Sequence, residues 1–208
     1  CIAKSFEWQA ADYLENQQYD SAEFCFSQAE RLFKETGCSD TILLSTYKNR
    51  ASLYYTKSDF GKAQEYSFKM LKVAELSGNV YETGNCYTMI AQLFNQTGQA
   101  VKGVHYTRKV FPLIDLITDP GKKADLLHKM SKRYLWYYQD TKAPGSLDTS
   151  EMLTYRQIEF ARSINRHSSL SVAYNNLQGI AWEKGDLRKA LIFLDSSFKY
   201  TDKENDAI

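Results

Sequence analysis

The sequence predicts an all-α fold of about five antiparallel helix pairs, and three observations support this class. Apolar positions follow one another at gaps of three and four residues, as in YDSAEFCFSQA at 19–29, which is helical spacing. Small residues recur within these patterns at nearly constant intervals along the chain. Three prolines and ten glycines in 208 residues argue against a protein built from β-turns and linkers.

Composition and charge restrict the class of protein further. Apolar residues make up 43% of the chain and charged residues 25%, an ordinary balance for a globular protein. The net charge of +1 favours neither nucleic acid nor an anionic membrane surface. A membrane helix needs about 18 apolar residues. The most apolar stretch, VFPLIDLI at 110–117, is shorter and contains Pro112 and Asp115.

The first helix of a pair is predicted wherever a large, a small and a large residue stand at i, i+4 and i+7, which is one helical face. The small residue allows a neighbouring helix to approach closely, and the large residues fill the space on either side. Three stretches have this pattern: Phe6, Ala10 and Tyr13; Tyr47, Ala51 and Tyr54; Tyr87, Ala91 and Phe94.

The second helix of a pair places its small residue three positions after its start. These residues are Ala22, Ala63, Gly103 and Ala190. From Ala22 to Ala63 is 41 residues, and from Ala63 to Gly103 is 40. The longer interval to Ala190, 87 residues, leaves room for one degenerate pair and an insertion. We expect its helices at 121–139 and 149–166, joined by an inserted loop at 140–148.

Local signals predict where several of these helices begin and end. Asp119 before Pro120 is typical of an N-cap followed by proline at the first helical position. Asp148 with Glu151 is typical of a capping box. Gly37 and Gly78 stand where second helices should stop, and Pro112 should kink or shorten the helix that contains it.

These patterns resemble the tetratricopeptide repeat family, whose motif combines the large, small and aromatic positions with a Gly-Asp-type turn and two later alanines. The chain departs from it at Met70, Gly103, Val110, Gln178 and Ala181, and its period exceeds the usual figure of about 34 residues. The resemblance implies a single α-α superhelix over residues 1–208. Its repeats would span 3–37, 41–78, 80–118, 121–167 and 170–202. The packing positions are Ala10, Ala22, Ala29, Ala51, Ala63, Ala91, Gly103 and Ala190.

The residues offer no catalytic or metal-binding pattern, so we predict that the chain is not an enzyme and takes no metal or cofactor. His105, His128 and His167 lie far apart, and the four cysteines, Cys1, Cys25, Cys38 and Cys86, form no CxxC. Cys25 is expected to be a small core residue. The basic window 121–133 is interrupted by Asp125, which favours a solvated helix face over a nucleic-acid site.

The resemblance implies that first helices line a concave groove, which would hold a protein or peptide partner. Repeat position assigns Lys4 and Glu7 to this surface. It also assigns Lys48, Ser52, Tyr55, Asn85, Thr88, Gln92, Asn95, Asp125, His128, Lys132, Trp136, Asn175 and Trp182. Such amide, hydroxyl and aromatic groups suit a peptide backbone or a polar small molecule. The alternative is that they are solvated helix positions that bind nothing.

The leading functional hypothesis is a protein-interaction module. The long, tyrosine-rich copies resemble the repeat regions of Bacteroidetes signalling and transcription-regulatory proteins, which implies membrane anchoring through a parent protein and an extracytoplasmic location. The alternatives are a cytoplasmic location, a sensor for a small polar ligand or peptide, and a structural part of an envelope complex. Cys1 is either a lipidation site or a trimmed end, and residues 201–208 resemble 36–43, as if another repeat followed.

Overall fold

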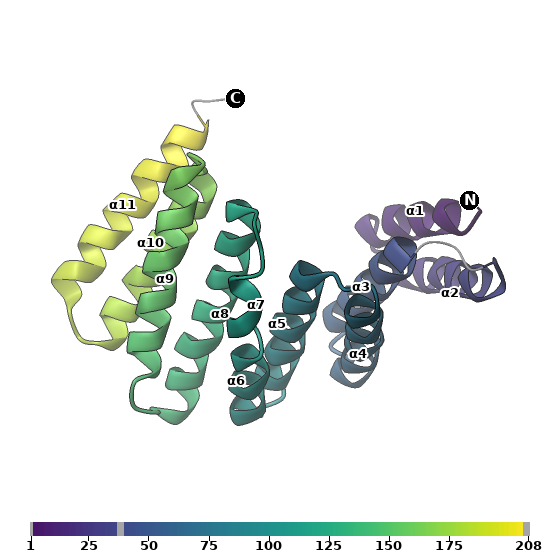
Figure 1. The fold of residues 1–208 in the computed structure, drawn as a ribbon, viewed down its shortest axis with the longest axis horizontal. Helices are drawn as coiled ribbons and strands as arrows, with labels where there is room; N and C mark the ends of the chain where they lie inside the picture. Colours follow the sequence, from purple (N-terminus) through teal and green to yellow (C-terminus); the bar gives the residue numbers. More distant parts are fainter. Residues whose placement is uncertain (1, 37–39, 206–208) are drawn as a thin grey trace. The chain divides into compact units, whose positions relative to one another are not determined.

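The computed structural model describes residues 2–36 and 40–205, and over these ranges every regular element is an α-helix (Figure 1). The expectations about Cys1, Gly37, Cys38 and the end of the segment 201–208 fall outside the described residues. The chain divides into two compact units, Cys1–Leu93 and Phe94–Ile208. The all-α prediction is confirmed, while the single repeat domain over 1–208 stays a prediction.

Unit 1 holds two complete helix pairs and most of a further helix. The first pair and the second pair each consist of two helices in mutual contact, and α3 also contacts both helices of the first pair. The elements are α1 (Ile2–Glu15), α2 (Tyr19–Thr36), α3 (Asp40–Thr56), α4 (Phe60–Leu76) and α5 (Val80–Gln96), which continues into unit 2.

The first pair closes around alanines. Ala10 of α1 and Ala22 of α2 are both 0% exposed and belong to one core cluster with Cys25 and Phe26. Phe6, Tyr13 and Leu14 pack against this cluster. The large residues therefore surround the small ones, as the spacing at i, i+4 and i+7 requires, and Cys25 is the core residue that the sequence indicates.

A buried ionic cluster joins the first pair to the second. Arg50 of α3 is 5% exposed, and its guanidinium binds Glu23 and Glu30, both on α2. It also lies over the Tyr66 ring of α4, 4.1 Å from the ring centre. Burial raises the pKa of Glu30, but bonds and charges from Lys34, Arg50 and Tyr47 outweigh this effect and hold that pKa below its ordinary value.

Unit 2 begins at the end of α5 and continues through six more helical segments. In Figure 1, α8, α9 and α10 lie side by side, and each contacts the next along the chain. The segments are α6 (Ala100–Arg108), α7 (Phe111–Ile114), α8 (Pro120–Thr141), α9 (Ser146–Ser163), α10 (His167–Glu183) and α11 (Leu187–Asn205).

Hydroxyl groups replace alanine at the centre of the degenerate pair. Ser131 of α8 and Ser150 of α9 are both 0% exposed, and each donates its hydroxyl to the other's backbone carbonyl, at 2.7 and 2.9 Å. Asn176 of α10 donates to Ser131 Oγ at 2.6 Å and to Thr154 Oγ1 at 2.9 Å. Small side chains thus still allow close approach here, with their polar atoms satisfied inside the network.

The helix ends follow the local signals with one exception. Asp119 caps α8, because its side chain accepts from Lys122 N at 3.0 Å. Gly78, with φ +66°, lies in the turn directly after α4. Pro112 stands in the short α7, after α6 has ended at Arg108. These three predictions are confirmed.

The predicted capping box at Asp148 is wrong, and so is most of the inserted loop at 140–148. Gly145, with φ +74°, is the N-cap of α9, so Asp148 lies inside the first turn and only residues 142–145 connect the helices. Asp148 and Glu151 both accept from Lys184 Nζ, at 2.7 and 2.6 Å. A partner distant in sequence therefore binds the two carboxylates that a capping box would have used.

We expect Ala63→Leu in α4 to lower the free energy of unfolding by roughly 1–3 kcal/mol, because a larger side chain overpacks a helix contact that is 0% exposed. Ala22→Leu should behave alike. Lys72→Leu, an exposed position on the same helix, serves as the control and should change stability by less than about 0.5 kcal/mol. Urea unfolding followed by circular dichroism measures all three variants, and equal losses would contradict the assigned packing face.

We expect Arg50→Met to cost about 3–5 kcal/mol of unfolding free energy at neutral pH, because Glu23 would lose its counterion in a mostly buried place and Glu30 would keep only Lys34. Arg31→Met, which removes an exposed pair with Glu35, should cost less than about 1 kcal/mol. Because the pKa of Glu30 is lowered, its contribution is present above the ordinary carboxylate pKa and is lost as the pH falls through the lowered value. The difference in unfolding free energy between Arg50→Met and Arg31→Met should therefore become smaller in acid. Urea unfolding at several pH values measures this difference.

Candidate functional site

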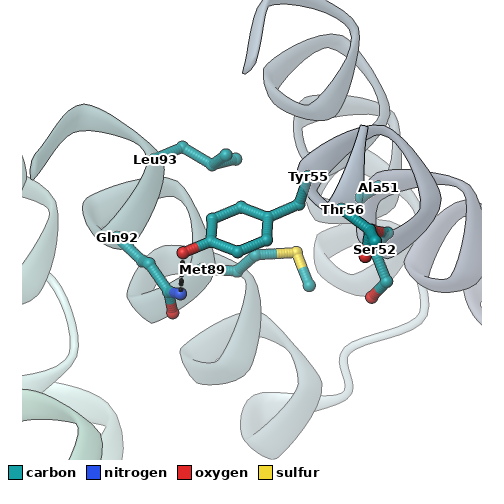
Figure 2. A pocket seen from close by; sticks show the side chains of 7 residues that line it. All are labelled: Ala51, Ser52, Tyr55, Thr56, Met89, Gln92 and Leu93. Atoms are coloured by element: carbon teal, nitrogen blue, oxygen red, sulfur yellow. Dashed lines mark hydrogen bonds between the residues drawn. The ribbon is translucent and has the colours of Figure 1, made fainter. Parts of the chain in front are cut away.

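A cavity of about 190 Å³ lies in unit 1 between α3 and α5, and we call it the Tyr55 cavity (Figure 2). Three of its lining residues, Ser52, Tyr55 and Gln92, are groove candidates from the sequence. The full lining is Ala51, Ser52, Tyr55, Thr56, Met89, Gln92 and Leu93. The first helices of two successive repeats therefore form the walls of one site.

A hydrogen bond across the cavity fixes the side chains of Tyr55 and Gln92. Figure 2 shows the Tyr55 ring extending from α3 toward Gln92 of α5, whose Nε2 donates to the Tyr55 hydroxyl at 3.1 Å. Phe60 meets the same ring edge-on, with centroids 5.7 Å apart. Tyr55 is half-buried, so one part of its ring is held by protein contacts and the remainder is available to a ligand.

The other lining groups make the cavity mainly apolar with a polar edge. The Met89 sulfur lies 3.2 Å from the hydroxyl of Ser67, whose shorter bond runs to the Ala63 carbonyl at 2.7 Å, and Leu93 is 1% exposed. Ser52 and Thr56 are exposed at the edge, where the Thr56 hydroxyl donates to the Ser52 carbonyl at 3.1 Å. This combination suits an apolar side chain of an extended segment whose backbone bonds to the edge.

The structure places the other unit 1 candidates differently. Lys48 is exposed on α3, and Asn85 donates to Glu82 Oε2 of its own helix at 3.4 Å. Thr88 is only 4% exposed, and its hydroxyl donates to the Asn85 carbonyl at 2.9 Å. Met89 takes the place at the cavity that repeat position assigns to Thr88.

A second cavity, of about 230 Å³, lies in unit 2 among α8, α9 and α10, and we call it the His128 cavity. Two groove candidates, Asp125 and His128, line it from α8. The complete lining is Asp125, His128, Gln157, Arg166, Ser168, Ser169 and Val172. Burial, together with the charges of Lys132 and Arg133, lowers the pKa of His128 to about 4, so its imidazole is neutral at physiological pH.

The remaining unit 2 candidates do not share one site. Asn95 lines a separate open depression beside the α5–α6 turn, and Lys132 lies over the Trp136 ring at 5.6 Å. Asn175 is exposed, and Trp182 is 64% exposed. The neighbouring residue Asn176, rather than Asn175, carries the buried polar contacts.

Sequence reasoning missed the residues that come from outside the first-helix pattern. Gln157 lies on a second helix, and Arg166 lies in the turn before α10, so neither belongs to a repeat position assigned to the groove. Met89 follows Thr88 directly in the sequence. The orientation of α5 about its own axis decides which of the two side chains faces the cavity beside α3. A glutamine at i+3 from Thr154 and i+7 from Ser150, on the buried face of α9, is a signal that could have indicated Gln157.

The packing positions assigned by the resemblance are all buried. Ala190 is the most exposed of the alanines at 4%, and Gly103 is buried within α6. Over residues 2–36 and 40–205, no group of three or more His, Cys, Asp or Glu side chains is arranged to hold a metal ion. Within the same ranges, no helix combines the length and the apolar character that crossing a membrane requires.

Comparisons with known proteins identify the fold. No family model and no curated protein sequence matches the chain. BtubC (BKLC) from P. vanneervenii is similar in structure, with a TM-score of 0.79 and 16% identity over 97% of this chain and 80% of that one. A putative kinesin light chain of Podosopora anserina, with nearly identical TPR-like repeats, has a TM-score of 0.72 and 15% identity over 97% and 95% of the two chains.

The apo form of RapI has a TM-score of 0.72 and 14% identity, covering 99% of this chain and 72% of that one. Sequence identities of 14–16% support a shared fold and carry no conclusion about function. The chain therefore has a tetratricopeptide-like repeat fold, as the resemblance implies.

We expect the stability of the chain to fall between about pH 6.5 and 4 because of His128. Its pKa is lowered from 6.5 to about 4, so the unfolded state binds more protons in this range and stability rises with pH. At about 1.4 kcal/mol per pKa unit, the loss on acidification is roughly 2–3 kcal/mol. His128→Gln should remove this part of the pH dependence. Urea unfolding of both proteins from pH 4 to 7 tests this, and parallel curves would contradict a buried neutral imidazole.

Proposed function

We propose that this chain is a non-catalytic interaction module whose Tyr55 cavity binds an extended segment of a protein partner. The observation that carries the proposal is the shape and chemistry of the cavity: an apolar interior beside an edge of hydroxyl and amide groups. An apolar side chain of the partner would enter between Tyr55 and Met89. The partner's backbone would then bond to the edge formed by Ser52, Thr56 and Gln92.

The hydrogen bond between Tyr55 and Gln92 supports this proposal because it orients both groups before any partner arrives. With Nε2 directed to the tyrosine, the Gln92 carbonyl oxygen is free to accept from a backbone N–H, and the Tyr55 hydroxyl retains its own proton to donate. Orienting these groups in advance reduces the entropy that binding would otherwise cost. The fold is consistent with this role, since stacked helix pairs offer extended surfaces to partners.

As to biological context, we propose that the module belongs to a bacterial signal-transduction or transcription-regulatory protein. This rests on the resemblance of the copies, about 40 residues long and rich in tyrosine, to the repeat regions of Bacteroidetes regulators. Attachment to a membrane through a parent chain or through Cys1 belongs to the same proposal. Sequencing the complete reading frame around this segment tests it, and a frame without an anchor or an output domain would count against it.

The binding proposal is tested by selecting peptides from a displayed random library and measuring their affinity for the chain by fluorescence polarisation. We expect Ser52→Trp, which would fill the cavity from its exposed edge, to weaken selected peptides at least tenfold. Gln92→Leu, which removes the polar groups at similar size, should weaken them several-fold. Tyr155→Ala is the control, because it removes a tyrosine that is 49% exposed on α9, outside the cavity.

Melting temperatures of the three variants show whether a loss of affinity reflects loss of fold. Selected peptides that bind Ser52→Trp as well as the unaltered chain would overturn the assignment of the Tyr55 cavity.

A further inference from the structure

We propose that the His128 cavity binds a small zwitterion of the α-amino acid class. This inference goes beyond the proposed function, because the cavity lies wholly in unit 2 and takes a small molecule rather than a protein segment. The proposal stands on a buried amide oxygen without a partner among the described residues, an ion pair in the lining and the first turn of α10.

The buried amide is that of Gln157, which is 1% exposed. Its Nε2 donates to the Ser169 backbone carbonyl at 3.0 Å, and a carbonyl can only accept, so the orientation of the amide is fixed. Gln157 Oε1 then has no hydrogen-bond partner among the described residues. A buried carbonyl oxygen without a donor is unfavourable, so the site favours a ligand that brings an N–H group.

The ion pair supplies one fixed charge of each sign. Arg166 Nη1 donates to Asp125 Oδ1 at 3.1 Å, and both side chains are partly exposed. A ligand with a single charge would be attracted by one member of this pair and repelled by the other. An α-amino acid has an ammonium and a carboxylate on the same carbon atom, so its two charges are about as close together as those of the pair.

The first turn of α10 favours the carboxylate end of such a ligand. Arg166 is the N-cap and provides no side-chain cap, and the first backbone bond of the helix runs from Leu170 N to the Arg166 carbonyl. The N–H groups of the first turn have no acceptor within the helix, and Ser168 and Ser169 of that turn line the cavity. A helix N-terminus with an adjacent guanidinium attracts a carboxylate.

The ammonium end would meet Gln157 Oε1 and the Asp125 carboxylate. His128 does not oppose it, because burial and nearby cations keep the imidazole neutral at physiological pH. Val172 is the one apolar side chain in the lining. The volume of about 230 Å³ compares with about 30 Å³ for a water molecule in the liquid. The cavity thus has room for roughly seven or eight groups the size of a water molecule, which matches alanine or serine more closely than aromatic or long charged amino acids.

Isothermal titration of the whole chain with L-alanine and L-serine tests the proposal. We expect saturable one-to-one binding and a raised melting temperature. L-Alaninamide lacks the carboxylate and L-lactate lacks the ammonium, so each should bind at least tenfold more weakly than L-alanine. Absence of binding up to 10 mM for both amino acids, or equal binding of alanine and its two analogues, would overturn the proposal.

A further titration distinguishes a free amino acid from a peptide terminus with the same carboxylate. The dipeptide glycyl-L-alanine retains the carboxylate but replaces the neighbouring ammonium by an amide. We expect it to bind at least tenfold more weakly than L-alanine. Tighter binding of the dipeptide would overturn the free amino acid and indicate a chain end instead.

Variants with matched controls place the binding in this cavity. Arg166→Gln and Asp125→Asn should each weaken L-alanine at least tenfold. Because the pair is partly exposed, its loss should leave the fold intact, which melting temperatures verify. Arg156→Gln and Glu183→Gln remove comparable charges of unit 2 outside the cavity and should leave binding unchanged. Equal effects of both sets would overturn the assignment, while the peptide affinity of the Tyr55 cavity should respond to neither.

Discussion

The close approach of helices at alanine-sized positions is the constraint on which the rest of the structure depends. Ala10 and Ala22 are fully buried, so the first two helices meet with only methyl groups between them. Phe6, Tyr13 and Phe26 must then pack around the contact rather than inside it. This arrangement uses one face of each first helix for packing, and it leaves the residues beside that face to form the surface between successive repeats.

The same arrangement produces two cavities of different chemistry because the side chains beside the packing face differ. In unit 1 the walls are a tyrosine ring, an alanine, a thioether and a leucine, with the polar groups of Ser52, Thr56 and Gln92 at the edge. In unit 2 the walls are an ion pair, an imidazole, an amide, two serines and one valine. The first suits an apolar side chain, and the second suits a small charged molecule. A repeat architecture can thus hold cavities of unrelated chemistry on one chain, since each cavity depends on local residues alone.

The periodicity of the sequence was sufficient to predict the all-α repeat fold, but it predicted only some of the residues that line the cavities. The expected helix at 121–139 corresponds to Pro120–Thr141 because Asp119, Pro120 and the apolar spacing all act locally. The capping box at Asp148 failed because α9 begins earlier, after Gly145, and Lys184, far along the chain, binds both carboxylates. Repeat position assigned Ser52, Tyr55 and Gln92 to the groove, and they line one cavity, whereas Gln157 and Arg166 lie outside first helices. Their proximity to His128 depends on the packing of three helices, which spacing along one helix does not encode.

Buried polar groups determine which helices pack against each other. The small and large apolar residues alone would fit several partner helices equally well. The α1–α2 and α3–α4 pairs offer alanines and aromatic rings at similar positions, so apolar packing alone would allow their helices to associate in the wrong order. Arg50 of α3 meets its two carboxylates only on α2, where Glu23 and Glu30 stand seven residues apart on one face. Asn176 of α10 likewise finds hydroxyl acceptors only where α8 and α9 bring Ser131 and Thr154 together. A mispaired helix would bury these groups without partners, and this cost selects the native order.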